Sequence, residues 1–218
     1  MEQDAFERMQ NSRIYRFFEF LYMLFQINLC MLLLTLCGMA VFGLFPAMFA
    51  AAAYVNDVFE GKEGKVFRSM WGYFRKYFWT GNLLMLLYAP AVALGFYAVY
   101  GRELNTALYF LLFCWLIGAV ALHWYLPAVN VLYPEFPVKK KILFALVVAC
   151  SRWMTTLLFL VFHAAWLYAV LLAPQLMMFI AFSTPVWFTL WRVKKAMKPE
   201  SFYDPWAEEE EIGGGHDE

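Results

Sequence analysis

The sequence predicts an all-α integral membrane protein with about five transmembrane helices and short amphipathic helices at the membrane interface. Hydrophobic residues make up 63% of the 218 residues and charged residues 16%, whereas a soluble domain has about 45–50% and about 25%. Uncharged runs cover residues 20–56 and 153–191, and each exceeds the about 20 residues that cross a bilayer. The basic residues gather in short segments between such runs. This pattern excludes a soluble enzyme, a disordered chain and a secreted disulfide scaffold.

The first uncharged run is too long for one straight span and barely long enough for two. Gly43 and Pro46 offer a break, because glycine loosens a helix and proline suits the first turn of a new one. We therefore expect a span over 19–43 and a helix over 46–59. A helix of about 14 residues is only about 21 Å long, so we expect it to lie at the interface or to re-enter. The alternative is a true crossing, which gives six spans.

The next segment, 57–76, combines basic residues with aromatic and apolar residues at helical spacing. This spacing predicts an amphipathic helix on the membrane surface, with its aromatic side chains at the level of the lipid headgroups. The helix is expected to continue directly into a second span over 78–100.

The second half of the chain contains the remaining spans. Residues 101–105 are expected to form a short turn, and a loop expected over 134–141 holds three consecutive lysines before a short apolar helix expected over 142–151. Pro174 divides the second uncharged run. The later spans are therefore expected over 106–128, 153–173 and 175–192.

The basic residues also predict the orientation of the chain. Five spans place 13 of the 17 basic residues on the side of the C-terminus, which is therefore expected to be cytoplasmic. Residues 1–198 form one transmembrane domain. Eight of the 17 acidic residues fall within 199–218 beside three consecutive glycines, so we expect a disordered acidic tail there.

Several motifs resemble one known family. They are Asn28, the Val-Phe-Gly-Leu-Phe-Pro-Ala segment at 41–47, the aromatic and basic block at 71–78, Asn82-Leu83, and Tyr-Leu-Pro at 125–127. Together they resemble the YesL-like bacterial membrane proteins, a domain of unknown function, over most of residues 15–198. The acidic tail and the heavy aromatic content depart from that family. The resemblance implies a multi-pass protein of the bacterial cytoplasmic (inner) membrane, encoded beside oligosaccharide ABC importers and polysaccharide-degrading enzymes. No catalytic activity is established for the family, so no active-site residue is transferred.

Polar residues inside the predicted spans are the main candidates for a site, because each is costly in the bilayer unless it is partnered or hydrated. We single out Asn28, Asn82, His123 and His163. The two asparagines are expected to form interhelical hydrogen bonds. The histidines have no third ligand beside them in the sequence, so we expect hydrogen-bonded histidines rather than a metal site. No nucleotide-binding, nucleophile or paired-carboxylate motif occurs, and we expect neither an enzyme nor a cofactor.

A partner surface is predicted where the amphipathic helix meets the second span. Trp71, Arg75 and Lys76 stand there, and they suit either lipid headgroups or a neighbouring protein. The helix that begins at Pro46 can present a complementary face. Basic residues scattered between apolar spans do not form a nucleic-acid surface.

Three hypotheses of function follow. The first is a non-enzymatic accessory subunit that packs against the permease and ATPase subunits of an oligosaccharide ABC importer. The second is a stand-alone sugar or small-molecule carrier, in which Asn28, Asn82 and His123 line a cavity and Trp79 and Trp124 stack on sugar rings. The third is a membrane or envelope sensor that uses the amphipathic helix. The substrate, the stoichiometry and the oligomeric state stay open.

Overall fold

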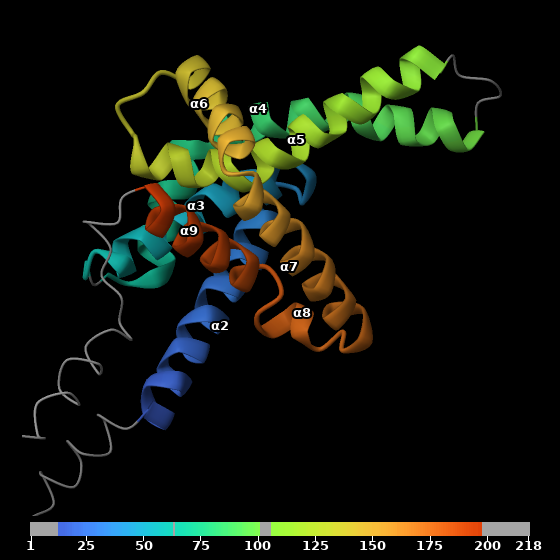
Figure 1. Cartoon of the computed structure of the whole chain (residues 1–218). Helices are drawn as coiled ribbons and strands as arrows, with labels where there is room; N and C mark the ends of the chain where they lie inside the picture. Colours follow the sequence, from blue (N-terminus) through green and yellow to red (C-terminus); the bar gives the residue numbers. More distant parts are fainter. Residues whose placement is uncertain (1–12, 63, 101–105, 198–218) are drawn as a thin grey trace, which may run out of the picture.

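The structure is a computed structural model that describes residues 13–62, 64–100 and 106–197 (Figure 1). Within these ranges every regular element is an α-helix, which confirms the predicted all-α class. The helices are α2 (Arg13–Cys37), α3 (Val41–Phe59), α4 (Val66–Tyr100), α5 (Thr106–Leu132), α6 (Val138–Ser151), α7 (Trp153–Leu172), α8 (Leu176–Phe179) and α9 (Ser183–Met197). Among the described residues, α2, α3 and α7 are long and apolar enough to cross a membrane.

Helix α3 lies at the centre of the molecule. It contacts α2, α4, α5 and α9, and its residues from Pro46 to Asn56 are all buried. Four consecutive alanines, 50–53, occupy this stretch. Small side chains allow neighbouring backbones to approach closely, which is how helices associate without a hydrophobic driving force between them.

The break between the first two helices differs from the prediction. It lies at residues 38–40 rather than at 43–46, and Pro46 lies inside α3. Met39 and Ala40 turn the chain with φ angles of 57° and 60°. Gly38 and Gly43 allow the turn because a Cβ on Gly38 would lie 2.3 Å from the Cα of Gly43. Helix α3 thus has 19 residues and the length to cross a membrane, so the short helix expected over 46–59 is corrected.

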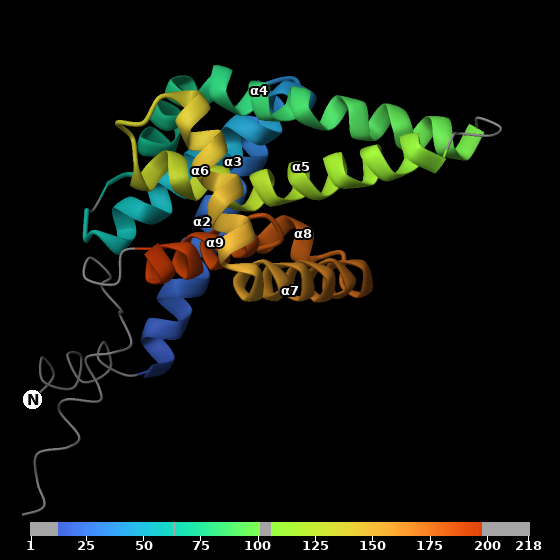
Figure 2. The same ribbon diagram turned by 45° about the horizontal axis from the view of Figure 1, so that its top comes forward.

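Helix α4 confirms the predicted continuity of the amphipathic segment with the following span. One helix of 35 residues runs through both. In its first turns Met70, Phe74 and Tyr77 are buried, whereas Arg68 and Arg75 are exposed. Figures 1 and 2 show α4 and α5 extending side by side from the body of the molecule. At their base, Gly81 of α4 packs on Pro46 of α3, where a Cβ would lie 2.6 Å from the proline nitrogen.

The expected helix over 175–192 is divided in the structure. The four-residue α8 ends at Phe179, and α9 begins at Ser183 and continues to Met197. The physical reason is a side chain of α2 that bonds the intervening backbone, as described below. The start of α4, the α5–α6 loop and the end of α9 lie at one end of the molecule, opposite the far tip of the α4–α5 pair (Figures 1 and 2). The basic segments therefore gather at one end.

Candidate functional site

Asn28 holds the break between α8 and α9. Its Nδ2 donates to the carbonyl oxygens of Met177 (3.0 Å) and Met178 (2.9 Å). Its Oδ1 accepts from the backbone N–H groups of Phe182 (2.8 Å) and Ser183 (3.3 Å). The asparagine is fully buried, so these bonds replace the water that backbone groups at a helix break otherwise need. This is the interhelical role that the sequence predicts for Asn28.

A two-part pocket lies between α3, α5, α7 and α9. The outer pocket has a volume of about 440 Å³, and its apolar walls include Phe45, Met48, Val170 and Phe182. The inner pocket has a volume of about 30 Å³ and reaches Ala52 and Thr189. The two parts share five residues, which are Met48, His123, His163, Pro185 and Val186. Both histidines singled out in the sequence therefore stand at the junction of the two parts.

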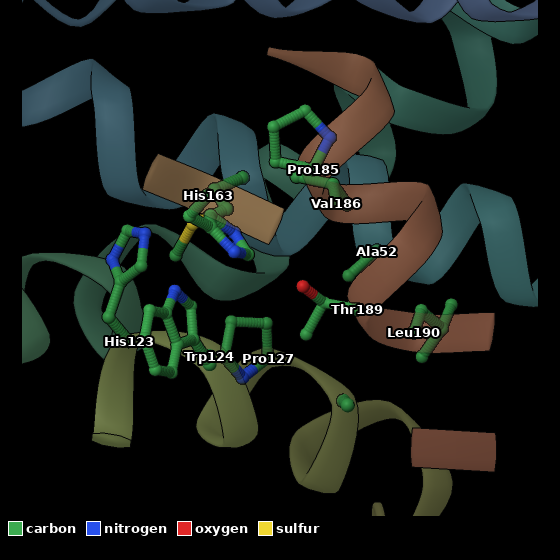
Figure 3. Close-up of a pocket in the computed structure, with 11 residues that line it drawn as sticks. Ala52, His123, Trp124, Pro127, His163, Pro185, Val186, Thr189 and Leu190 are labelled. Carbon is green, nitrogen blue, oxygen red and sulfur yellow. The ribbon is translucent and has the colours of Figure 1, made fainter. Parts of the chain in front are cut away.

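The two histidines approach this junction from different helices. Figure 3 shows His123 and Trp124 projecting from α5, and His163 reaching the same space from α7. The ring centroids of Trp124 and His163 are 5.0 Å apart. His163 Nδ1 lies 2.8 Å from the carbonyl oxygen of Phe159. Since a carbonyl oxygen only accepts, Nδ1 carries the hydrogen, and a neutral imidazole then has its acceptor lone pair on Nε2.

The structure does not assemble the residues expected for a sugar carrier. Neither Asn28 nor Asn82 lines the pocket, whereas His123 and Trp124 do. Trp79 is 82% exposed. Asn82 donates to Phe78 O of its own helix, and its buried Oδ1 has no recorded partner among the described residues. Its predicted interhelical bond is therefore not found there. No group of three or more potential metal ligands occurs in the described part of the chain.

A cluster of polar side chains lies at the basic end of the molecule. Lys194 of α9 is only 1% exposed, and its Nζ lies 3.3 Å from Asn56 Oδ1 and 3.8 Å from Glu60 Oε1. Glu60 also accepts from Asn56 Nδ2 (2.8 Å) and Lys62 Nζ (2.6 Å). Burial raises the pKa of Glu60, but the hydrogen bonds from Lys62 and Asn56 and the nearby lysine charges outweigh it and lower the pKa. The cluster joins α9 to the end of α3.

A second lysine is buried in α6. Lys141 is 7% exposed, and its Nζ donates to Asn130 Oδ1 at 2.8 Å. Burial lowers the pKa of Lys141. The sequence places Lys141 and Lys194 among the basic residues of one membrane face, but their charges are enclosed by the protein. The basic surface is therefore smaller than the sequence indicates.

The predicted partner residues lie at the start of α4. Phe67 is 53% and Trp71 39% exposed, and their rings stack with centroids 6.5 Å apart. Arg68 and Arg75 are exposed as well. Helical spacing places these four side chains within one stripe about 100° wide, and we call this stripe the α4 face. Lys76 lies outside it, with its Nζ 5.2 Å from the ring centroid of Tyr77.

Sequence reasoning missed most of the pocket walls and the lysine cluster. Trp166 donates from Nε1 to Ala181 O at 2.9 Å and so ties α7 to the α8–α9 break beside the pocket. Pro185, which lines both parts of the pocket, is a sequence signal for a helix start that could have located the beginning of α9. Nothing local in the sequence marks Lys194 as buried.

Comparison with known proteins identifies one similarity. The family model described as "Protein of unknown function, DUF624" matches residues 24–100. The match covers most of α2 and all of α3 and α4, so it includes Asn28, Pro46 and the α4 face. Searches of curated proteins and of solved structures found no match. Over residues 24–100 the chain is therefore similar to a family of unknown function, within an apolar helical framework typical of membrane proteins.

Proposed function

We propose that the protein is a non-enzymatic accessory subunit of an oligosaccharide ABC importer in the bacterial cytoplasmic membrane, with its C-terminus in the cytoplasm. The observation that carries this proposal is the α4 face, where stacked, exposed aromatic rings lie beside two arginines. The resemblance to YesL-like proteins supports the importer as the partner. The similarity over residues 24–100 includes this face.

The α4 face has the composition of a protein-binding surface. Aromatic residues and arginine are enriched at protein interfaces, whereas lysine is depleted. Next to this stripe on the same helix, Met70 is fully buried and Phe74 and Tyr77 are nearly so, so the core fixes the orientation of the exposed stripe. A partner that covers Phe67 and Trp71 would remove exposed apolar surface at a site that is already ordered.

Co-purification tests the proposal. The tagged full chain is expressed with the permease and ATPase subunits under an inducing sugar and purified in mild detergent, and the recovered subunits are quantified. We expect Trp71→Ala and Arg75→Glu each to reduce recovery more than about tenfold, as central interface residues do. Lys139→Glu is the matched control, because Lys139 is an exposed basic residue on α6 and should retain recovery.

Lipid anchoring makes a different prediction for these variants. If the α4 face binds only anionic headgroups, Arg75→Glu and Lys139→Glu should have similar effects on vesicle binding and none on subunit recovery. Recovery of the chain alone would show that the importer is not its partner. Equal recovery of the subunits with all three variants would show that the α4 face is not the docking surface.

The carrier hypothesis has weaker support in the geometry. The pocket contains His123 and Trp124, but its walls are mainly aliphatic and aromatic. Sugar hydroxyls need many hydrogen-bonding groups, because a buried polar group without a partner is costly. Uptake of labelled oligosaccharide into vesicles that contain only this protein would nevertheless establish a carrier, and absence of uptake would eliminate it.

A further inference from the structure

We propose that the two-part pocket binds a lipid-soluble small molecule with an apolar body and one hydrogen-bond donor, such as a hydroxyl group, which enters from the bilayer. The apolar body occupies the outer pocket, and the donor faces His163 Nε2 at the junction with the inner pocket. This site is independent of the proposed docking function, because it uses none of the residues of the α4 face.

The size of the pocket fits a small molecule. Ligand pockets usually have volumes of about 300–1,000 Å³ and are mainly apolar with a few placed polar groups. The outer pocket has about 440 Å³ and is lined by methionine, leucine, valine and aromatic side chains. The inner pocket has about 30 Å³, which exceeds the about 10–15 Å³ that a cavity needs to hold one water molecule. The inner part therefore suits a single polar head or its bound water.

The position of the pocket indicates entry from the bilayer. Helix α7 is long and apolar enough to cross a membrane, yet only 11% of its most apolar stretch is buried in the protein. Most of its surface is thus available to lipid chains. Three residues line the outer pocket and are also exposed on the surface. They are Leu167 of α7 (61% exposed), Leu44 of α3 (40%) and Met177 of α8 (49%). An apolar molecule in the bilayer can therefore reach the outer pocket without crossing a polar surface.

The chemistry of the junction specifies a donor on the ligand. His163 Nδ1 is occupied by Phe159 O, so the neutral ring offers an acceptor at Nε2. The indole of Trp124 lies beside the same ring, and Figure 3 shows the hydroxyl of Thr189 on the opposite side of the inner space. A hydroxyl group can donate to the imidazole and also accept from a water or from Thr189. A pure hydrocarbon can do neither.

Photolabelling of the full chain in lipid nanodiscs tests this inference. The probes are a long-chain alcohol with a diazirine in its chain and the matched hydrocarbon without the hydroxyl group. We expect the alcohol to label residues of the outer pocket, such as Phe45 and Val186, in preference to the outward-facing Leu171, and an excess of unlabelled alcohol to abolish this labelling.

Two pairs of variants locate the site and the polar contact. Val170→Trp fills the outer pocket and should reduce pocket labelling about tenfold, whereas Leu171→Trp on the exposed side of α7 should leave it unchanged. His163→Phe keeps an aromatic ring but removes the acceptor, so labelling by the alcohol should fall about fivefold, the effect of one hydrogen bond. Labelling by the hydrocarbon should not change in that variant.

Three results would overturn the inference. The first is labelling that is spread evenly over α7 and is not displaced by unlabelled alcohol. The second is an equal effect of Val170→Trp and Leu171→Trp in proteins with the same thermal unfolding midpoint. The third is equal pocket labelling by alcohol and hydrocarbon with no effect of His163→Phe, which would mean that lipid chains merely fill the space. If Val170→Trp does not fold, displacement of the labelled alcohol by unlabelled alcohol and the labelling of His163→Phe still show whether the pocket binds the alcohol specifically.

Discussion

Replacement of Asn28 by leucine should destabilise the protein more than any other polar-to-apolar change in α2. The side chain is fully buried and makes four hydrogen bonds of 2.8–3.3 Å to the backbone between Met177 and Ser183. Side-chain hydrogen bonds in membrane proteins contribute about 0.6 kcal/mol each on average, and some reach about 1.7 kcal/mol. Leucine has the same branching and the same number of side-chain heavy atoms, but its methyl groups are bulkier than the amide, so overpacking adds to the loss of the hydrogen bonds. Four bonds then give a decrease of about 2–4 kcal/mol in the free energy of unfolding.

The assay is unfolding by sodium dodecyl sulfate in mixed micelles, followed by tryptophan fluorescence. Gln26→Leu is the matched control, because Gln26 is a half-buried polar residue of the same helix, and it should change the free energy by less than about 0.5 kcal/mol. Hydrogen exchange gives a local measurement, in which the amides of Phe182 and Ser183 should lose protection in Asn28→Leu. Equal stability of the two variants, with unchanged protection of these amides, would refute the assignment of Asn28 as the residue that holds the break.

Two further predictions concern the packing of α3 and the lysine cluster. Gly81→Ala should lower the free energy of unfolding by about 1–3 kcal/mol, as overpacking does, because its Cβ would lie 2.6 Å from the backbone nitrogen of Pro46. The control is Gly72→Ala, whose Cβ meets nothing within 4 Å and which should not destabilise the protein in the same unfolding assay. Equal losses of stability in the two variants would contradict the close α3–α4 contact. Glu60 has a lowered pKa in the folded protein, so its contribution to stability is complete above its ordinary pKa and is lost as the pH falls through the lowered one. Unfolding midpoints measured from pH 7 downward should therefore fall more steeply below about pH 5 in the unmodified chain than in Glu60→Gln, and parallel curves would show that Glu60 does not couple to Lys62 and Asn56.

The helices that the sequence predicts well are those with a strong local signal. Helix α4 follows from the spacing of buried Met70, Phe74 and Tyr77 between exposed basic residues, and that periodicity is a property of the segment itself. The turn at residues 38–40 has no such signal. It depends on the contact of Gly38 with Gly43 and on two non-glycine residues with positive φ, whereas Pro46 is a more obvious but misleading break.

The pocket and the lysine cluster could not be predicted for a different reason. His123 and His163 are visible in the sequence as polar residues of apolar helices, but their shared position depends on how α5 and α7 pack around α3 and α9. Lys194 has the appearance of a surface residue at the end of a basic helix. Its burial depends on Asn56, 138 residues earlier in the chain. Long-range contacts of this kind leave no periodicity to detect.

Asn28 connects the region of family similarity to the pocket. Residues 24–100 include Asn28 and the α3 wall of the pocket but not α7, α8 or α9. The amide bonds the backbone of Met177 and Phe182, and both residues line the outer pocket. The pocket wall formed by α8 and α9 lies outside the matched region, but Asn28, which lies within the matched region, positions it. Since the α4 face lies on another helix and makes no bond to Asn28, loss of this amide should disturb the pocket while leaving the docking surface in place.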